Sequence, residues 1–155
     1  MKNLALLIAV LCCTISGTKA QQAERKVLFV GNSYTYGYNL PHIVSIIAKE
    51  TSIPLDTRKS TMGGATLKEH WTGGRELETK KLIAEGDFDA VVLQDFSMSA
   101  MHSPDTSLKY IQLFCDYIRS HGGKPYLFNT WAREKVPQYQ DEIDAMYMQA
   151  AKAYN

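Results

Sequence analysis

Short apolar runs alternate along the chain with segments whose apolar residues recur at helical spacing. The runs predict four strands, at residues 27–30, 55–60, 90–93 and 125–128. The second run is the most polar, as an outer strand would be. The helical patterns predict four helices, at residues 40–51, 67–84, 103–120 and 138–154. Gly73 and Gly74 interrupt the second pattern, so we expect that helix in two pieces.

This order of strands and helices predicts an α/β fold, a three-layer α/β/α sandwich around a parallel, flavodoxin-like sheet. Parallel neighbours need crossover connections, and right-handed crossovers place helices on both faces of the sheet. In such sheets the chemistry collects where the strands end at their carboxyl side. We therefore expect functional residues in four segments, 31–35, 61–64, 94–102 and 129–131.

The first twenty residues have the layout of a secretory signal peptide. Lys2 supplies the positive start, residues 4–13 are apolar, and Ala20 ends a small-residue exit. The apolar run is too short to span a bilayer. We therefore expect a signal peptide at residues 1–20, one domain at residues 21–155, no membrane span after cleavage, and a secreted or periplasmic location in a bacterium.

Composition and charge exclude several classes of protein. The 155 residues carry 17 Lys and Arg against 16 Asp and Glu, a formal net charge of +1, so a polybasic nucleic-acid binder is excluded. With 45% hydrophobic and 21% charged residues the chain is globular.

Cys115 alone would remain after signal cleavage, among apolar residues, and is expected in the core. No cluster of ligand residues predicts a metal, and no cofactor is expected.

Ser33 is the first candidate for chemistry, because it follows a predicted buried strand within Gly31-Asn32-Ser33-Tyr34-Thr35. The glycine permits a sharp turn, and a helix starting there offers free N–H groups. A serine so placed can attack an acyl carbon while its own N–H stabilises the oxyanion. A serine that merely caps the turn explains the same pattern.

The motif order resembles that of the SGNH (GDSL-type) hydrolases, in a poorly characterised secreted bacterial branch. Residues 27–35 resemble the first block, whose serine is the nucleophile, here Ser33. Residues 62–67 stand where the second block supplies an oxyanion-hole N–H, which the resemblance assigns to Gly64. Residues 91–97 stand where the third block belongs, and the similarity covers residues 26–155.

The chain departs from that family pattern in two places. The third block lacks the usual asparagine donor, and Gln94 or Ser97 would take its place or merely hold the loop. The family's Asp-x-x-His, which supplies acid and base after a fifth strand, occurs nowhere in the sequence. The resemblance therefore implies an SGNH fold that lacks its last strand and helix.

Four further residues are candidates for the cleft: Asn32, Tyr34, His102 and Trp131. His102 follows the third strand on the active side but is expected to be solvated. Aromatic rings stack on sugar faces, so a small-molecule or carbohydrate ester is the expected substrate class, although Tyr34 and Trp131 also suit ordinary packing.

Three functions fit these residues. The first is a serine esterase or acyl hydrolase with Ser33 as nucleophile, an oxyanion hole from Ser33 and Gly64, and acid and base absent from this chain. The second is a non-catalytic secreted protein that binds glycans on the same fold. The third is a flavodoxin-like phosphate binder, although the loop after the first strand is poor in glycine.

Overall fold

Four parallel strands form the centre of the computed structural model, which describes residues 23–154. The predicted signal peptide at residues 1–20 lies outside the described residues. The strands are β1 (Arg25–Gly31), β2 (Leu55–Thr61), β3 (Ala90–Leu93) and β4 (Lys124–Leu127). Their order in the sheet is β2-β1-β3-β4, with every pair parallel. The predicted parallel α/β sheet is confirmed, with the polar second strand at its edge.

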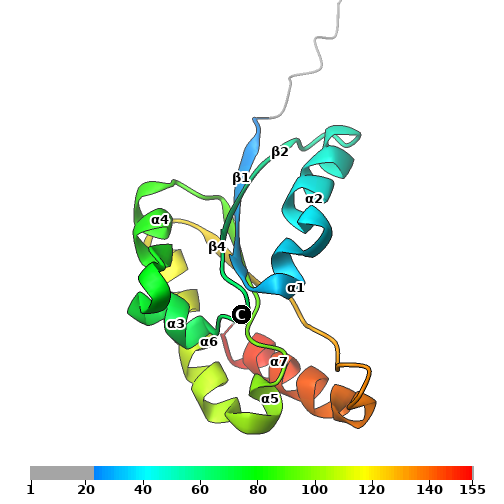
Figure 1. Ribbon diagram of the computed structural model, residues 1–155. Helices are drawn as coiled ribbons and strands as arrows, with labels where there is room; N and C mark the ends of the chain where they lie inside the picture. The colour runs from blue at the N-terminus through cyan, green and yellow to red at the C-terminus, as the bar shows by residue number, and fades with distance from the viewer. Residues whose placement is uncertain (1–22, 155) are drawn as a thin grey trace, which may run out of the picture.

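Helices cover both faces of this sheet, and Figure 1 shows α2 on one side with α3, α4 and α6 on the other. The helices of the described part are α1 (Ser33–Tyr36), α2 (Leu40–Lys49), α3 (Leu67–Thr72), α4 (Thr79–Glu85), α5 (Ser99–His102), α6 (Pro104–Ser120) and α7 (Gln140–Tyr154). Short 3₁₀ turns lie at η1 (Gly37–Asn39), η2 (Gly74–Glu76) and η3 (Pro137–Tyr139). The sequence pattern missed α1 and α5, because four residues are too few to show a helical period. No helix in residues 23–154 is both long and apolar enough to cross a membrane.

Local chemistry sets the ends of α3. The Thr66 hydroxyl oxygen accepts from the Glu69 N–H, and the Glu69 carboxylate accepts from the Thr66 N–H, which together form a capping box. Gly73 ends the helix with φ at +75°, a left-handed conformation that favours glycine. The predicted interruption at Gly73 is therefore confirmed, and α4 begins only at Thr79.

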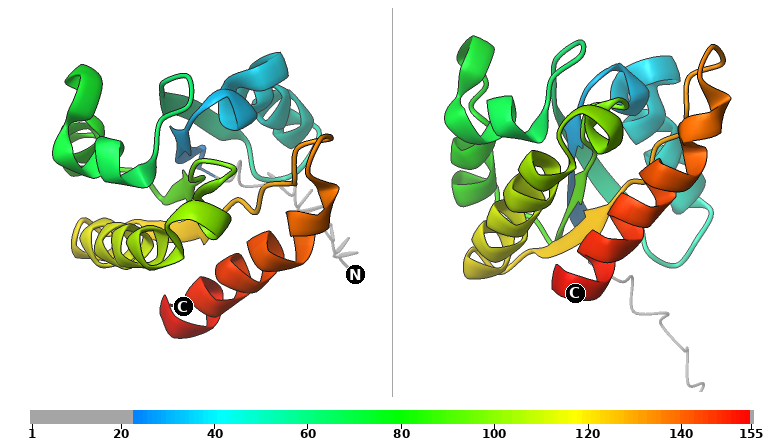
Figure 2. Two further views of the ribbon diagram at one scale, coloured as in Figure 1. Left: turned by 60° about the horizontal axis from the view of Figure 1, so that its bottom comes forward. Right: turned by 90° about the horizontal axis from the view of Figure 1, so that it is seen from below.

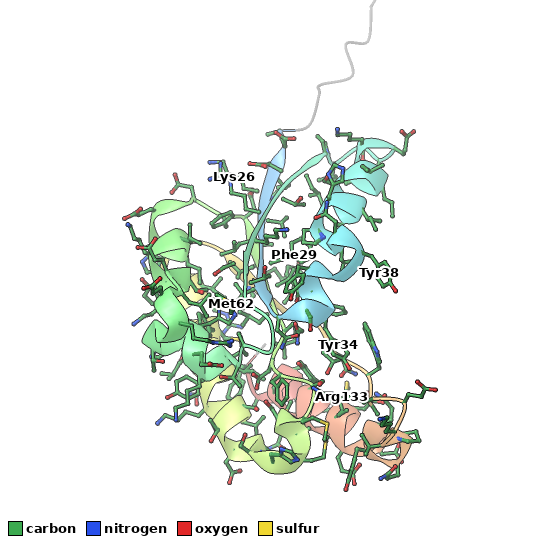
Figure 3. The ribbon with its side chains drawn as sticks, in the orientation of Figure 1. Lys26, Phe29, Tyr34, Tyr38, Met62 and Arg133 are labelled. Carbon is green, nitrogen blue, oxygen red and sulfur yellow. The ribbon has the colours of Figure 1, made fainter. Side chains whose placement is uncertain are left out.

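The main core lies between the sheet and the helices α3, α4 and α6. Leu28 and Val30 of β1 and Val91 and Leu93 of β3 face this layer, together with Phe114 of α6. Side chains alternate along a strand, so Phe29 points to the other face, toward α2, as Figure 3 shows. Cys115 also lies in this core, as expected, and burial raises the pKa of its thiol.

The strand order places β1 and β3 side by side at the point where the chain reverses its direction across the sheet. From β1 the chain crosses to β2 on one side, and β3 then pairs with β1 on the other. Gly31 pairs with Thr61, and Val30 pairs with Leu93. The loops after β1, β2 and β3 therefore leave the sheet at one edge, which is turned toward the viewer in Figure 2. In open α/β sheets ligands bind at such a switch point.

We expect Phe114→Ala to lower the free energy of unfolding by about 3–5 kcal/mol, because the ring is fully buried and its loss leaves a cavity. Met148→Ala is the matched control: this side chain is 56% exposed on α7, and its loss should change stability by no more than about 0.5 kcal/mol. Urea unfolding followed by circular dichroism measures both. Equal effects in the two variants would contradict this description of the core.

Candidate active site

The loops after β1, β2 and β3 are held against one another by backbone hydrogen bonds. The Gln94 N–H donates to the Val30 carbonyl oxygen at 2.9 Å, which keeps the third loop beside the first. On the other side of β1, the Met62 N–H donates to the Gly31 carbonyl oxygen at 3.2 Å. Three of the four segments predicted from the strand ends therefore meet at one edge of the sheet.

Ser33 is exposed and is the first residue of α1, directly after the buried Asn32. The Asn32 carbonyl oxygen accepts from the N–H groups of Thr35 at 2.9 Å and Tyr36 at 3.1 Å, so it points into α1. The N–H of a trans peptide points opposite to its carbonyl, so the Ser33 N–H points out of the helix. Within residues 23–154 neither this N–H nor the Ser33 hydroxyl has a protein hydrogen-bond partner. Both groups are available to a ligand.

The side chain of Asn32 joins all three loops. Its Oδ1 accepts from the Tyr34 N–H at 3.1 Å and caps α1. Its Nδ2 donates to the carbonyl oxygen of Ala65 at 2.9 Å and, more weakly, to that of Asp95 at 3.5 Å. The residue is only 1% exposed, so it is not the cleft residue that the sequence predicted. Its role is to position the turn.

Gln94 is fully buried beneath the same turn, which fits the alternative that it holds the loop and does not fit a role as oxyanion donor. Its Oε1 accepts from the Asn32 N–H at 2.9 Å and from the Thr35 hydroxyl at 2.8 Å. Its Nε2 donates to the Asp95 carbonyl oxygen. With its oxygen and nitrogen thus engaged below the surface, Gln94 supports the turn instead of donating into the cleft.

Gly64 presents a second free N–H beside the turn. Its φ of +66° lies in the left-handed region that favours glycine, and a Cβ built there meets no atom within 4 Å. Its N–H donates to no protein acceptor in the described part of the chain. The loop is anchored where Ala65 accepts from Asn32 and where the Leu67 N–H donates to Asp95 Oδ1 at 2.8 Å. The loop that carries Gly64 is therefore fixed directly after this glycine, at Ala65 and Leu67.

Ser97 lies deeper than predicted, since it is only 2% exposed. Its Oγ accepts from Arg133 Nε at 3.2 Å, so its own hydroxyl hydrogen remains free to donate. Arg133 lies over the Phe96 ring at 5.2 Å and forms no ion pair among residues 23–154. Figure 3 shows Arg133 at the same end of the molecule as Tyr34. The sequence pattern gave no signal for Arg133.

An apolar cavity of about 450 Å³ opens beside Ser33. Its wall is mainly aromatic and aliphatic, and it comprises Ser33, Tyr34, Gly37, Tyr38, Leu40, Ile43, Phe128 and Trp131. The rings of Tyr34 and Trp131 are 4.6 Å apart, centre to centre, and Trp131 is 53% exposed. The structure therefore brings together three of the predicted residues, Ser33, Tyr34 and Trp131. The volume is typical of small-ligand sites.

No histidine or carboxylate in residues 23–154 hydrogen-bonds to the Ser33 hydroxyl. His102 ends the helix α5 instead of lying in a loop, and it is exposed, as expected of a solvated side chain. His70 is fully buried. The described residues also contain no group of three or more His, Cys, Asp or Glu side chains placed to bind a metal ion.

Sequence reasoning overlooked Asp95, which is buried at the start of the third loop. Its carboxylate accepts from the Leu67 and Phe96 N–H groups, each at 2.8 Å, and from the Ser107 hydroxyl at 2.5 Å. Its own N–H donates to the Tyr147 hydroxyl at 3.1 Å, and burial raises the pKa of that hydroxyl. The available signal was an acidic residue two positions after the end of an apolar strand.

Solved structures with the same fold include SGNH-type hydrolases and esterases. A protein of Slackia heliotrinireducens assigned to the SGNH hydrolases matches with a TM-score of 0.74 and 21% identity, over 85% of this chain and 76% of that one. TesA matches with a TM-score of 0.70 and 15% identity, over 84% of this chain and 74% of that one. The psychrotrophic esterase EstA of Pseudoalteromonas sp. matches with a TM-score of 0.64 and 11% identity, over 85% of this chain and 74% of that one. No family model and no curated protein matches. The chain therefore has the SGNH hydrolase fold that its motifs predicted.

The turn before Ser33 requires glycine at position 31. A Cβ there would clash with Thr35 Oγ1 and lie 2.5 Å from Gln94 Oε1, so Gly31→Ala should displace the Gln94 amide and lower the free energy of unfolding by about 1–3 kcal/mol. Gly37→Ala is the control, because its φ is −54° and a Cβ there meets nothing within 4 Å, so its stability should change by less than about 1 kcal/mol. Urea unfolding compares the two. Equal stability of Gly31→Ala and Gly37→Ala would show that the close packing around the turn is wrong.

Proposed function

We propose that the protein is a serine-dependent ester hydrolase of the SGNH type, in which Ser33 is the nucleophile. The carrying observation is the exposed Ser33 hydroxyl at the carboxyl end of a central strand, with its own N–H free at the start of α1. The free N–H of Gly64, in the loop that Asn32 joins to this turn, supports an oxyanion hole formed by the two amides.

The proposed reaction has two steps. In the first, Ser33 Oγ attacks the ester carbonyl carbon, the carbonyl oxygen takes negative charge, and the Ser33 and Gly64 N–H groups donate to it. The alcohol then leaves with a proton, and an acyl-serine remains. In the second step water attacks the same carbon, the acid is released and the serine hydroxyl is restored. The free hydroxyl hydrogen of Ser97 is a candidate third donor.

The reaction needs a general base that removes the proton from Ser33. No residue of the described part makes that hydrogen bond. We assign the role to an Asp-x-x-His block of the SGNH type, which this sequence does not contain. The residual rate of a serine without its base rests on the oxyanion donors alone, which still contribute some catalysis.

We further propose a carbohydrate ester as the substrate and a location outside the cytoplasm, in accord with the predicted signal peptide. The exposed Trp131 and the fully solvated Tyr38, 99% exposed, offer ring faces on which a sugar can stack. Leu40 and Ile43 line the cavity beside Ser33 and suit the apolar part of an acyl group.

A glycan-binding protein without catalysis is the second candidate. The observation that favours it is the Ser33 hydroxyl without a base, beside a cavity that keeps its aromatic wall. The two candidates differ in one property, because only the hydrolase forms a covalent bond to Ser33.

With imidazole added to supply the missing base, a fluorophosphonate probe should label the chain at Ser33, and Ser33→Ala should remove the label, because the probe needs an activated hydroxyl beside oxyanion donors. After the rate of imidazole with the ester alone is subtracted, added imidazole should raise hydrolysis of p-nitrophenyl acetate by the chain and not by Ser33→Ala, since it supplies the missing base in solution. Ser52→Ala, which alters an exposed serine outside the site, is the control and should behave as the original chain. Peptide mass spectrometry locates the label. A label on another residue, or imidazole-stimulated turnover by Ser33→Ala above the rate without protein, would refute the nucleophile assignment.

Trp131→Ala should weaken binding of an acetylated sugar roughly two- to tenfold, the range given by about 0.5–1.5 kcal/mol for a stacked ring. Tyr126→Ala is the control, because Tyr126 is also exposed, at 47%, but does not line the cavity. Isothermal titration with both variants measures the difference. A loss of affinity in Tyr126→Ala as large as in Trp131→Ala would place the sugar elsewhere.

A further inference from the structure

A line of three buried polar side chains, from β2, α4 and α3 in turn, leads to the turn that precedes Ser33. Ser60 Oγ and Thr79 Oγ1 lie 2.8 Å apart, and Thr79 Oγ1 lies 2.7 Å from Nδ1 of His70. On the other side of the ring, His70 Nε2 lies 3.0 Å from the carbonyl oxygen of Gly31. His70 and Thr79 are fully buried and Ser60 is 6% exposed, so water does not compete for these bonds.

The partners fix the direction of every bond in this line. A carbonyl oxygen only accepts, so His70 Nε2 carries the hydrogen that reaches Gly31. In a neutral ring Nδ1 then accepts, and the donor is the Thr79 hydroxyl. Thr79 has given its hydrogen to the ring, so its oxygen accepts from the Ser60 hydroxyl. The three contacts together select one tautomer of His70.

The bond to Gly31 fixes one side of the peptide group between Gly31 and Asn32. The carbonyl oxygen of this group accepts from His70 Nε2 and from the Met62 N–H, and its N–H donates to Gln94 Oε1 at 2.9 Å. Because a peptide group is planar, side chains that bind both its ends prevent its rotation. Only one further peptide group, between Asn32 and Ser33, separates it from the Ser33 Cα.

The surroundings of His70 agree with a neutral ring. Burial lowers the pKa of His70, and this effect outweighs the hydrogen bond to Gly31 and the negative charges of Glu69 and Asp95, while the positive charge of Arg75 lowers the pKa further. The neutral form is therefore the one present at neutral pH.

We propose that His70 is a positioning residue of the Ser33 site: its neutral Nε2–H tautomer, selected by Thr79 and Ser60, holds the Gly31 carbonyl and so fixes the turn that presents Ser33. That His70 affects the reactivity of Ser33 rests on the proposed function. That His70 fixes the conformation of the turn does not. No substrate contacts His70, which acts through the backbone.

Two substitutions of similar size separate this role from general support of the core. In His70→Gln the side-chain NH₂ reaches the place of Nε2 and can still donate to Gly31. In His70→Asn the shorter amide reaches only the place of Nδ1 and keeps the contact with Thr79. We expect His70→Gln to keep the rate of fluorophosphonate labelling at Ser33 within about threefold, and His70→Asn to lower it about ten- to a hundredfold, because the reacting group is misplaced. Equal labelling rates in the two folded variants would overturn the proposal.

Nuclear magnetic resonance tests the turn without any chemistry. Long-range ¹H–¹⁵N spectra of the chain should show His70 protonated at Nε2 only, and a ring protonated at Nδ1 would overturn the proposal whether or not a variant folds. The amide signals of Asn32 and Ser33 should move in His70→Asn and stay near their places in His70→Gln. If the original chain is not labelled by the probe even with imidazole present, the hydrolase proposal fails, and these signals alone decide the role of His70.

The stability of the chain should also depend on pH through His70. The unfolded chain takes up a proton near the ordinary histidine pKa of about 6.5, whereas the folded chain takes it up only at lower pH. Unfolding is therefore favoured as the pH falls below about 6.5, and the loss continues down to the lowered pKa. His70→Gln cannot titrate and should show a flatter pH dependence of the urea midpoint than the original chain in this window. Parallel curves for the two proteins would contradict the burial of a neutral ring.

Discussion

Two buried side-chain amides, those of Asn32 and Gln94, hold the candidate site together. A buried amide must find a donor for its oxygen and an acceptor for its nitrogen, because leaving either unpaired costs about 1–3 kcal/mol. Asn32 meets this demand with Tyr34, Ala65 and Asp95, and Gln94 meets it with Asn32, Thr35 and Asp95. Every partner lies in one of the loops that follow β1, β2 and β3 or at the start of α1. The loops cannot separate without leaving these amides unpaired.

The exposed and the buried residues of this arrangement have different roles. Ser33 and Gly64 keep their N–H groups free at the surface, while the groups behind them are all paired: no buried side-chain nitrogen or oxygen of residues 23–154 lacks a partner. Donors that are fixed in advance need no reorganisation when charge develops on a substrate. Precision at an exposed site therefore comes from the buried layer beneath it.

Sequence reasoning predicted the fold well but predicted the buried residues that support the site poorly. The apolar run of β1 is buried on both faces and that of β3 is buried on one face and half-buried on the other, so the positions of both strands were clear. The end of β1 pointed to Ser33, whereas Gly64 was chosen from the family resemblance. Two roles stayed open for Gln94, because a sequence shows that an amide follows a strand but not whether it turns outward or under the loop. His70 was one polar residue in a helical pattern, and its partners at positions 31 and 79 become neighbours only through the fold.

The spacing of the Asn32 and Gln94 contacts along the chain also has a kinetic consequence. Asn32 bonds to Gln94 across 62 positions, and Asp95 bonds to Tyr147 across 52. Contacts of such long range form slowly, since the intervening loop must close before they stabilise anything. During synthesis on the ribosome the segment around Ser33 emerges early but has to wait for the third strand. Formation of the turn that holds Ser33 is therefore a late step in the folding of this polypeptide.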